Sequence, residues 1–432
     1  MSTPSFVRAA MLPPQKPPIS QIGIYRWARE NLFSGPGNTL LTLLAIYVVY
    51  FIVTLIGPWL TRAVWDANSL SECRAITAAK YGPGIEGACF ALIRERLPQF
   101  LFGFYPKALY WRPILTFALL LVAIAPILFN ALPRKMLWFS VIFPAVGFWL
   151  LWGGSVWLPV VAMAGFGAGF VAYVLVRPVS SLMAAIAALL VPILWWLLLT
   201  GPLSDLLQQL LPLGIRSLRS ADMGGFMLSL IIGVSGIAFS LPLGILLALG
   251  RQSDMPLVKM ICVGFIEAIR GVPLITLLFT ASLLLNYFLP PGTNFDIILR
   301  VIIMVTLFSA AYMAEVIRGG LAALPRGQFE AADALGLNYW QAQQYIVMPQ
   351  ALKISIPSIV GNFIGLFKDT TLVIFIGLQD PLALISAVRA NTAWNGTYWE
   401  PIILVGGLFF IVCFSMSRYS MYLERKLKTD HR

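Results

Sequence analysis

Histidine is nearly absent from this sequence of 432 residues, in which the single histidine is His431, next to the C-terminus. Catalysis or metal binding through imidazole groups therefore has almost nothing to work with, and we expect neither a metal nor a cofactor. The dipeptide Gly-Lys is also missing, which excludes the phosphate-binding loop GxxxxGK[ST]. The glycine-rich run 165–169 lies inside an apolar segment and favours close helix packing over nucleotide binding. We therefore do not expect this chain to be an enzyme.

Cysteine is scarce as well, with four residues that do not follow a metal-ligand spacing. Cys262 and Cys413 lie in apolar runs and are expected to be buried thiols. Cys73 and Cys89 share a long polar loop. If that loop lies in an oxidising compartment, a disulfide between Cys73 and Cys89 is a possible outcome.

Charged residues make up only 11% of the chain, whereas 59% of the residues are hydrophobic and the mean hydropathy is +0.84. A soluble domain could not bury so much apolar surface, so we expect an all-α, polytopic membrane protein. The net charge of +12 could indicate nucleic-acid binding. The basic residues fall between the apolar runs, however, without an aromatic–basic stripe. We interpret them as topology signals of a protein in a lipid bilayer and expect no nucleic-acid partner.

About ten apolar runs are long enough to cross a bilayer. They cover residues 39–60, 113–132, 136–152, 157–176, 182–200, 224–249, 271–289, 297–317, 353–378 and 400–421. An even number of spans places both termini on one side of the membrane. Lys and Arg are concentrated in the short segments on that side, so the positive-inside rule predicts that both termini are cytoplasmic.

The segments between these spans complete the predicted organisation. Residues 1–38 are expected to form a Pro-rich cytoplasmic tail with a short interfacial helix around 20–33, and residues 425–432 a second cytoplasmic tail. The long loop 61–112 is expected outside, with aromatic residues as interfacial anchors and a small local fold.

Two charged residues, Lys368 and Asp369, lie inside the apolar run 354–378. A charge at the bilayer centre costs about 2.5–3.5 kcal/mol, so such residues face a bundle interior or a cavity. As neighbours in sequence, the two side chains point in different directions. They either meet the carboxylate or ammonium of a substrate or lock helices or subunits together. Neutral polar lining of a pathway would come from Asn362, Thr370 and Thr371.

A polar stretch between two of the spans predicts a structured hairpin. Residues 328–335 are good helix formers, and Gly336 follows where a helix end favours positive φ. Asn338 can cap a second helix, with Gln341 as its capping-box partner. Pro349 is expected to stop or redirect that helix. In the first helix, Glu330 and Asp333 provide an acidic, solvent-exposed face.

This hairpin resembles the signature loop of the membrane permease subunits of ATP-binding-cassette (ABC) importers. The matching residues are Glu330, Ala331, Ala332, Gly336, Ile346 and Pro349. The sequence departs from the pattern at Met348, where the family usually has Leu, a change that conserves volume. The resemblance implies that the coupling hairpin, residues 318–349, docks on a separate ATPase, and that Asp333 belongs to the same contact.

Three further stretches resemble the permeases that import polar or general L-amino acids. They are residues 267–274, 312–320 and 365–372. Within the first, the spacing of Glu267 and Arg270 favours a salt-bridged helix start over ligand contacts. The resemblance is dense over 224–424, which implies a five-helix permease core of the ABC type I importer fold. It is weaker over residues 1–223, where residues 39–223 would be an accessory membrane region.

This resemblance implies an amino-acid importer of the bacterial inner membrane that works by alternating access. Its expected partners are two copies of an ABC ATPase subunit, a second permease subunit, a periplasmic amino-acid-binding protein and the amino acid itself. The alternative is an ion-coupled secondary transporter or channel without an ATPase. A docking hairpin and the lack of a visible inverted repeat argue against this alternative.

Overall fold

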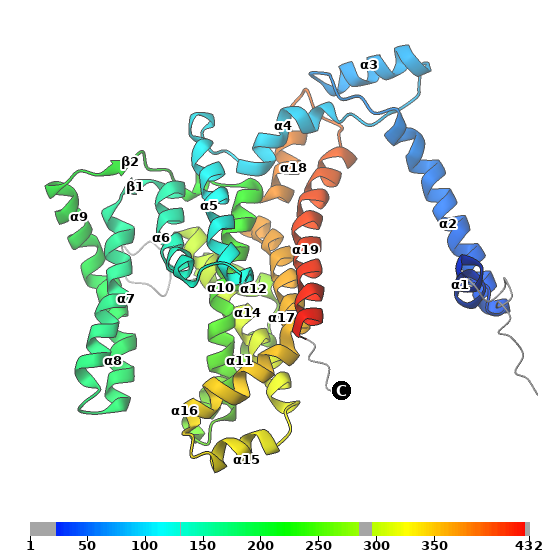
Figure 1. The fold of residues 1–432 in the computed structure, drawn as a ribbon. Coiled ribbons are helices and arrows are strands. Elements are labelled where there is room, and N and C mark those ends of the chain that lie inside the picture. The colour runs from blue at the N-terminus through cyan, green and yellow to red at the C-terminus, as the bar shows by residue number, and fades with distance from the viewer. Residues whose placement is uncertain (1–22, 130, 285–295, 428–432) are drawn as a thin grey trace, which may run out of the picture. The chain divides into compact units, whose positions relative to one another are not determined.

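The computed structural model describes residues 23–129, 131–284 and 296–427, which are almost entirely helical (Figure 1). Parts of four predicted segments fall outside these ranges: the N-terminal tail before residue 23, residue 130 of the predicted span 113–132, the end of the predicted span 271–289, and the last five residues with His431. The chain divides into two compact units, Met1–Ala91 and Leu92–Arg432.

From residue 23 onward, the first unit contains three helices, α1 (Gly23–Asn31), α2 (Pro36–Thr61) and α3 (Leu70–Tyr81). In α1, the large side chains of Ile24, Tyr25 and Trp27 are all exposed. This short helix lies within the range predicted for an interfacial helix. No residue of α2 is buried, and its sequence is apolar over its whole length. A helix that is apolar on every face is suited to contact with lipid.

The second unit begins with an accessory series of helices and a two-stranded antiparallel ribbon that pairs Gly154 with Ile215. The α-helices and strands are α4 (Ala91–Phe102), α5 (Trp111–Leu128), α6 (Leu137–Trp152), β1 (Gly154–Ser155), α7 (Trp157–Val176), α8 (Ser181–Leu194), α9 (Thr200–Leu210) and β2 (Gly214–Ile215). Short 3₁₀ helices are η2 (Lys107–Leu109), η3 (Arg134–Met136) and η5 (Ser220–Asp222), and η4 (Trp195–Leu199) is a π-helical turn.

The core follows in the same unit. Its α-helices are α10 (Gly225–Gln252), α11 (Pro256–Arg270), α12 (Leu274–Phe279), α14 (Ile297–Ala322), α15 (Gly327–Ala334), α16 (Tyr339–Ala342), α17 (Met348–Asp369), α18 (Pro381–Arg389) and α19 (Trp399–Leu427). The π-helical turns η6 (Thr280–Leu284) and η7 (Gln343–Val347) and the 3₁₀ helix η8 (Thr370–Ile376) interrupt this series.

Membrane-spanning helices agree in number with the sequence prediction. In the described part of the chain, nine helices are long and apolar enough to cross a membrane, and a tenth is obtained if one bent pair counts as a single span. The bent pair joins α11 to Leu274–Ser282 at an angle of 102°. The predicted span at this place, 271–289, missed α11 because hydropathy alone does not detect an amphipathic helix that carries charges.

The bend also corrects the expectation for Glu267 and Arg270, which lie at the C-terminal end of α11 and not at a helix start. The physical reason is Pro273, three residues after the last residue of α11. Pro273 has an extended ψ of 141° and caps the start of α12. Since proline disfavours helical geometry in the residue before it, α11 cannot run straight on into α12.

Within the accessory helices, α7 and α8 pack closely at glycines of the run 165–169. A Cβ atom on Gly165 would lie 2.6 Å from the indole nitrogen of Trp196, and one on Gly169 would lie 2.5 Å from Pro192. The Trp195 and Trp196 indoles each donate a hydrogen bond of 2.9 Å to a carbonyl of α7. The helices are therefore closely packed at this run, as predicted.

The accessory helices contact the core at the N-terminal ends of α10 and α14. We call this the capping junction, formed around Gly103, Ser220, Gly224, Asp296 and Gln379. The Trp152 indole donates to Ser220 Oγ at 2.8 Å, and the Ser220 hydroxyl donates to Asp296. Asp296 in turn accepts from the backbone N–H of Ile298 at 2.9 Å and so caps α14. The accessory region and the core, whose predicted division lies at residue 223, are therefore in contact. The division stays a prediction that rests on where the sequence resembles the permease family.

Backbone contacts complete the capping junction. The N–H of Gly225 donates to the carbonyl of Gln379 at 2.7 Å, and Gly224 pairs with Gln379 in an isolated β-bridge. A Cβ atom on Gly103 would lie 2.5 Å from the Cα of Gly224, so the two chain segments touch through glycine backbone. The start of α10 is thereby fixed between the accessory region and the segment before α18.

Candidate functional site

The coupling hairpin, residues 318–349, begins in the last residues of α14 and contains α15, α16 and η7. Helix α15 ends in a Schellman motif: the N–H of Gly336 donates to the Asp333 carbonyl at 2.9 Å, and the N–H of Leu337 donates to the Ala332 carbonyl at 3.2 Å. Gly336 has φ +69°, as the sequence predicts for this turn. No other group lies within 4 Å of a Cβ built on Gly336, so backbone strain and not crowding selects glycine.

The second helix of the hairpin begins with the predicted capping box. Asn338 Oδ1 accepts from the N–H of Gln341 at 2.9 Å, and Gln341 Oε1 accepts from the N–H of Asn338 at 3.0 Å. Contrary to our expectation, Pro349 does not stop this helix, because α16 continues through η7 into α17. The π turn η7 ends at Val347, two residues before Pro349, and its wider turn accommodates a residue that cannot donate a regular helix hydrogen bond.

A surface on the hairpin combines acidic and apolar side chains. Glu330 and Asp333 are both exposed. The nearby Leu335, Trp340 and Tyr345 are 72%, 65% and 66% exposed, which is high for such large apolar groups. An apolar patch with a polar rim is typical of a protein–protein contact. We call the surface formed by Glu330, Asp333, Leu335, Trp340 and Tyr345 the hairpin tip.

The other hairpin residues predicted for ATPase coupling differ in burial. Ala332 is completely buried, so the middle of the Glu-Ala-Ala motif packs inside the hairpin. Ala331 and Pro349 are exposed and Ile346 is half-buried. The motif therefore contains packing positions as well as surface positions.

Two glutamines form a hydrogen bond that connects the hairpin to α17. This contact was not predicted from the sequence. The side-chain amide of Gln350 donates to Gln328 Oε1 at 2.9 Å and to the Ile346 carbonyl at 2.8 Å. Gln328 belongs to α15 and Gln350 to α17. The hydrogen bond therefore links α15 directly to α17, in addition to the chain between them.

Five charged residues meet near the hairpin end of α14. We call Arg251, Glu267, Arg270, Glu315 and Arg318 the ionic cluster. Glu315 is its centre: Arg318 donates to it, Arg251 lies 3.4 Å from it and Arg270 3.7 Å. Arg251 also lies 2.9 Å from Glu267.

The ionic cluster brings together two of the stretches noted in the sequence, 267–274 and 312–320, and joins them to the end of α10. The pair predicted from spacing, Glu267 with Arg270, is the longest contact of the cluster at 4.0 Å. Glu315 with Arg318 is a second local pair, three residues apart. The contacts of Arg251 with Glu267 and Glu315, and of Arg270 with Glu315, join residues distant in sequence, which no local pattern could have found.

The polar residues predicted for a substrate pathway occupy different surroundings around the end of α17. Lys368 is exposed, Asp369 is half-buried, and no ion pair joins them in the described chain. Thr370 is completely buried and its hydroxyl donates to the Phe367 carbonyl at 2.8 Å. Thr371 likewise donates to the carbonyl of Lys368 at 2.9 Å. The two threonines satisfy the last carbonyls of the helix.

Helix α17 ends at Asp369, which shifts the expected depth of the charged pair. Lys368 lies 20 residues after Met348, so the helical rise carries it about 30 Å from the hairpin. That places Lys368 and Asp369 near the end of the span. The free-energy cost of a charge is lower there than at the centre of the bilayer. Asn362 is half-buried, and its side-chain amide nitrogen is buried without a hydrogen bond in the described chain.

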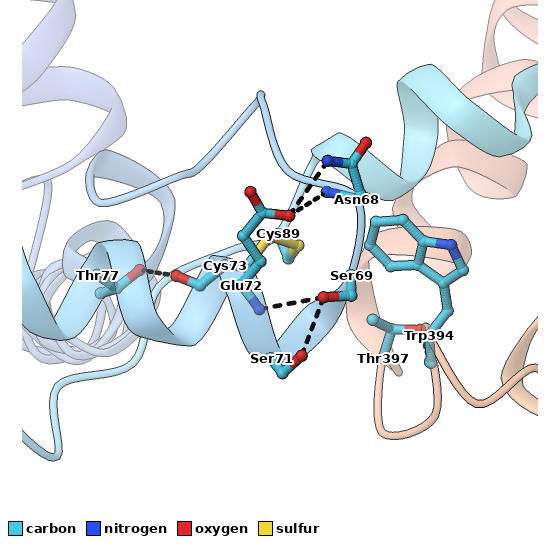
Figure 2. The surroundings of a disulfide bond; sticks show 9 residues. All are labelled: Asn68, Ser69, Ser71, Glu72, Cys73, Thr77, Cys89, Trp394 and Thr397. Atoms are coloured by element: carbon cyan, nitrogen blue, oxygen red, sulfur yellow. Dashed lines mark hydrogen bonds between the residues drawn. A yellow bond between two sulfur atoms is a disulfide. The ribbon is translucent and has the colours of Figure 1, made fainter.

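The long loop after α2 is closed by a disulfide between Cys73 and Cys89, whose Cα atoms are 5.8 Å apart (Figure 2). Ser69 caps α3 by accepting from the N–H of Glu72, and Glu72 in turn accepts from the N–H of Asn68 at 2.7 Å. The disulfide thus joins the first turn of a well-capped helix to the strand-like segment before α4.

Comparisons with known proteins agree with this architecture. Residues 240–429 match the family described as binding-protein-dependent transport system inner membrane component. The chain is 62% identical over 434 residues to the glutamate/glutamine/aspartate/asparagine transport system permease protein BztC of Rhodobacter capsulatus, covering 100% of both chains. It is 38% identical over 406 residues to the inner membrane amino-acid ABC transporter permease protein YhdY of Escherichia coli, covering 93% of each.

A solved structure titled "Crystal structure of an amino acid ABC transporter with histidines" is 29% identical, with a TM-score of 0.41, and covers 46% of this chain and 90% of that chain. The fold defines a helical, multi-pass membrane protein with an importer-type permease core. The chain belongs to the family of inner membrane components of binding-protein-dependent transport systems. It is a permease subunit of an ABC transporter and not the ATPase. The family and the relatives named above favour this assignment over an ion-coupled transporter or channel.

Proposed function

We propose that this chain forms part of the transmembrane path of an ATP-driven importer that moves polar L-amino acids into the cytoplasm by alternating access. The substrates would be acidic amino acids and their amides. The full-length identity of 62% to a permease named for glutamate, glutamine, aspartate and asparagine supports this substrate class. The binding protein that delivers the substrate would select among these amino acids.

The hairpin tip is the observation that carries the proposal. It exposes large apolar side chains beside Glu330 and Asp333 on a hairpin whose shape is fixed by a Schellman motif and a capping box. Such a surface fits a groove on a separate ATPase subunit. Two ATPase copies would bind, one to this chain and one to a second permease subunit. Closure of the ATPases on ATP would displace α15 and, through Gln328 and Gln350, also α17.

The proposed orientation places both termini, the coupling hairpin and the ionic cluster in or near the cytoplasm. The distribution of Lys and Arg between the spans supports it. The loop between α2 and α4 would then face the periplasm, where a disulfide persists. A periplasmic amino-acid-binding protein would dock on this outer side of the complex.

The exposed ammonium of Lys368 is proposed to meet either the substrate carboxylate or the second permease subunit. Lipid is the less favourable surrounding for an exposed charge on a span, so a partner or a water-filled path is expected there. Asn362 and Asp369 lie seven residues apart on α17 and therefore share one face of the helix. With Lys368 beside this face, an amino acid would find acidic, basic and amide groups together.

The test is purification of the complex from the native membrane in detergent, followed by reconstitution in liposomes. We expect an ABC ATPase to co-purify with the tagged permease, and uptake of L-glutamate or L-glutamine to require ATP and a binding protein. Uptake that follows an ion gradient in vesicles without any ATPase would contradict the proposal.

A further inference from the structure

The disulfide-closed loop carries a hollow that no part of the transport mechanism uses. It has a volume of about 300 Å³ and lies between the segment that follows α2 and the last turns of α3. Its lining includes Arg62, Trp65, Asp66, Thr77, Lys80 and Tyr81. Two basic residues, one acidic residue and two aromatic rings therefore border a space large enough for a small polar group.

The two cations of the hollow converge on one aromatic ring. The Arg62 guanidinium carbon lies 5.7 Å from the centre of the Tyr81 ring, and Lys80 Nζ lies 5.3 Å from it. Neither cation forms an ion pair in the part of the chain that the structure describes. Like charges that share one ring repel each other, and an anion placed between them would relieve that repulsion.

The walls of the hollow are fixed by covalent and backbone contacts. The disulfide holds α3 to Cys89, and the Thr77 hydroxyl donates to the Cys73 carbonyl at 2.9 Å (Figure 2). On the other wall, the N–H of Val64 donates to the Ala88 carbonyl at 2.8 Å, and the Val64 carbonyl accepts from Ala91 at 3.1 Å. A site with such walls is formed before a ligand arrives, which lowers the entropic cost of binding.

The position of the hollow indicates which anion it meets. The apolar helix α2 ends at Thr61, and Arg62 is the next residue. Trp65 is 60% exposed and Tyr81 is 38% exposed, and exposed Trp and Tyr at the end of a span are typical of the headgroup level. The anion present there at high concentration is the phosphate group of phospholipids.

We propose that this hollow binds the phosphate of an anionic phospholipid headgroup, with Arg62 and Lys80 as the charged contacts and Tyr81 positioning both. The lipid would anchor the loop at the membrane surface next to the end of α2. This assignment is independent of the transported substrate.

The test uses the purified full chain in nanodiscs of phosphatidylcholine with phosphatidylglycerol added, and native mass spectrometry to count retained phosphatidylglycerol. The variant combines Arg62→Gln with Lys80→Gln. We expect it to retain this lipid roughly thirtyfold more weakly, from about 1 kcal/mol for each basic residue near an anionic membrane surface. Arg74→Gln is the matched control, since Arg74 belongs to the same loop but does not line the hollow. This control should retain lipid like the wild type.

Four results would overturn the proposal. Equal lipid retention in the double variant and the wild type would show that the hollow takes no headgroup, and equal losses in Arg74→Gln would reduce the effect to net charge. Retention that inorganic phosphate abolishes without any preference for phosphatidylglycerol would assign the hollow to a small soluble anion. Unchanged lipid counts with weaker capture of the periplasmic binding protein would instead make the occupant an acidic side chain of that protein.

Discussion

The two ends of helix α14 are held in different ways. At its start, in the capping junction, buried Ser220 and glycine backbone hold the chain segments together. At its other end, the ionic cluster joins α10, α11 and α14 through long side chains, with Glu315 itself 25% exposed. Contacts between backbones cannot slide without breaking, whereas arginines can exchange carboxylate partners at little cost. We therefore expect the core to pivot about the capping junction and to rearrange at the hairpin end.

Gly103→Ala is expected to have the largest effect, because it breaks the capping junction. A Cβ on Gly103 would lie 2.5 Å from Gly224, and Gly103 also has φ +67°. Crowding costs roughly 1–3 kcal/mol, and the left-handed backbone adds about 1 kcal/mol. We expect a large loss of folded protein, measured as monodisperse protein after detergent extraction.

The control for this variant is Gly406→Ala in α19, where no other group lies within 4 Å of the added Cβ. It should leave the yield unchanged or raise it, since alanine favours helix. Normal yield of Gly103→Ala would mean that the accessory region is not joined to the core as the structure has it.

Glu315→Gln should disturb the hairpin end without unfolding the protein. The change removes the carboxylate that three arginines share. Loss of a hydrogen bond to a charged group costs about 1.5–3 kcal/mol. We expect ATP-driven uptake to fall by about tenfold or more, with partial recovery in Glu315→Asp and an altered ratio of ATP hydrolysis to uptake.

For comparison, Glu30→Gln removes a carboxylate from an exposed ion pair with Arg26. Exposed pairs contribute little, so uptake should stay at the wild-type level. If both variants behaved alike, the ionic cluster would be an ordinary surface feature, and the contrast between the two ends would be lost.

Ser220→Ala tests the side-chain part of the capping junction. The Ser220 hydroxyl links the Trp152 indole to Asp296, the cap of α14. Its loss leaves the half-buried Trp152 indole N–H and the exposed Asp296 carboxylate without this partner, at about 0.5–1.5 kcal/mol for each hydrogen bond. We expect a lower melting temperature in a detergent-based thermal assay, with uptake per folded molecule unchanged. A loss of uptake at unchanged melting temperature would show that Ser220 takes part in the transport motion and is not a fixed contact of the capping junction.

The smallest expected effect concerns Asp380, which caps α18 beside the capping junction and is completely buried. Burial raises the pKa of Asp380 to about 6, although the N–H groups of Ala383 and Leu382 donate to it and act in the opposite direction. A raised pKa means that the folded state holds the proton more tightly than the unfolded state. The resulting stability is complete below the ordinary pKa of 3.8 and is lost as the pH rises through about 6.

Thermal stability should therefore decrease by roughly 1 kcal/mol between pH 5 and pH 7 through this group alone. In Asp380→Asn that part of the pH dependence should disappear. An identical pH profile in the variant and the wild type would show that Asp380 is ionised in the folded protein at both pH values.

The features that could be predicted from the sequence are those that depend on interactions between residues close together in the chain. Gly336 terminates α15 and Asn338 caps α16 with Gln341, because these hydrogen bonds form within a few residues. Apolar runs likewise identify spans, since bilayer thickness fixes their length. Sequence reasoning failed at Pro349 because a π turn absorbs the missing hydrogen bond, which a local rule does not foresee.

The remaining features depend on residues that only the fold brings together. Arg251 meets Glu267 and Glu315, which follow it by 16 and 64 residues. The contacts of Ser220 with Trp152 and Asp296 bridge 68 and 76 residues. Charged and hydroxyl residues of this kind have many possible partners, so their pairing could not be predicted from a single sequence.

The central claim is that the coupling hairpin transmits ATP-driven motion to the core. ATP-driven uptake in proteoliposomes tests it most directly, with Gly336→Val and Glu330→Lys each assembled with the ATPase. Valine at φ +69° costs about 1–3 kcal/mol of local strain, and lysine reverses a charge on the hairpin tip. The matched controls are Gly336→Asn, which tolerates the left-handed backbone, and Glu330→Gln. We predict that both test variants insert in the membrane but lose uptake and retain less ATPase on purification, while Gly336→Asn transports like the wild type. Wild-type uptake in both Gly336→Val and Glu330→Lys would contradict the account.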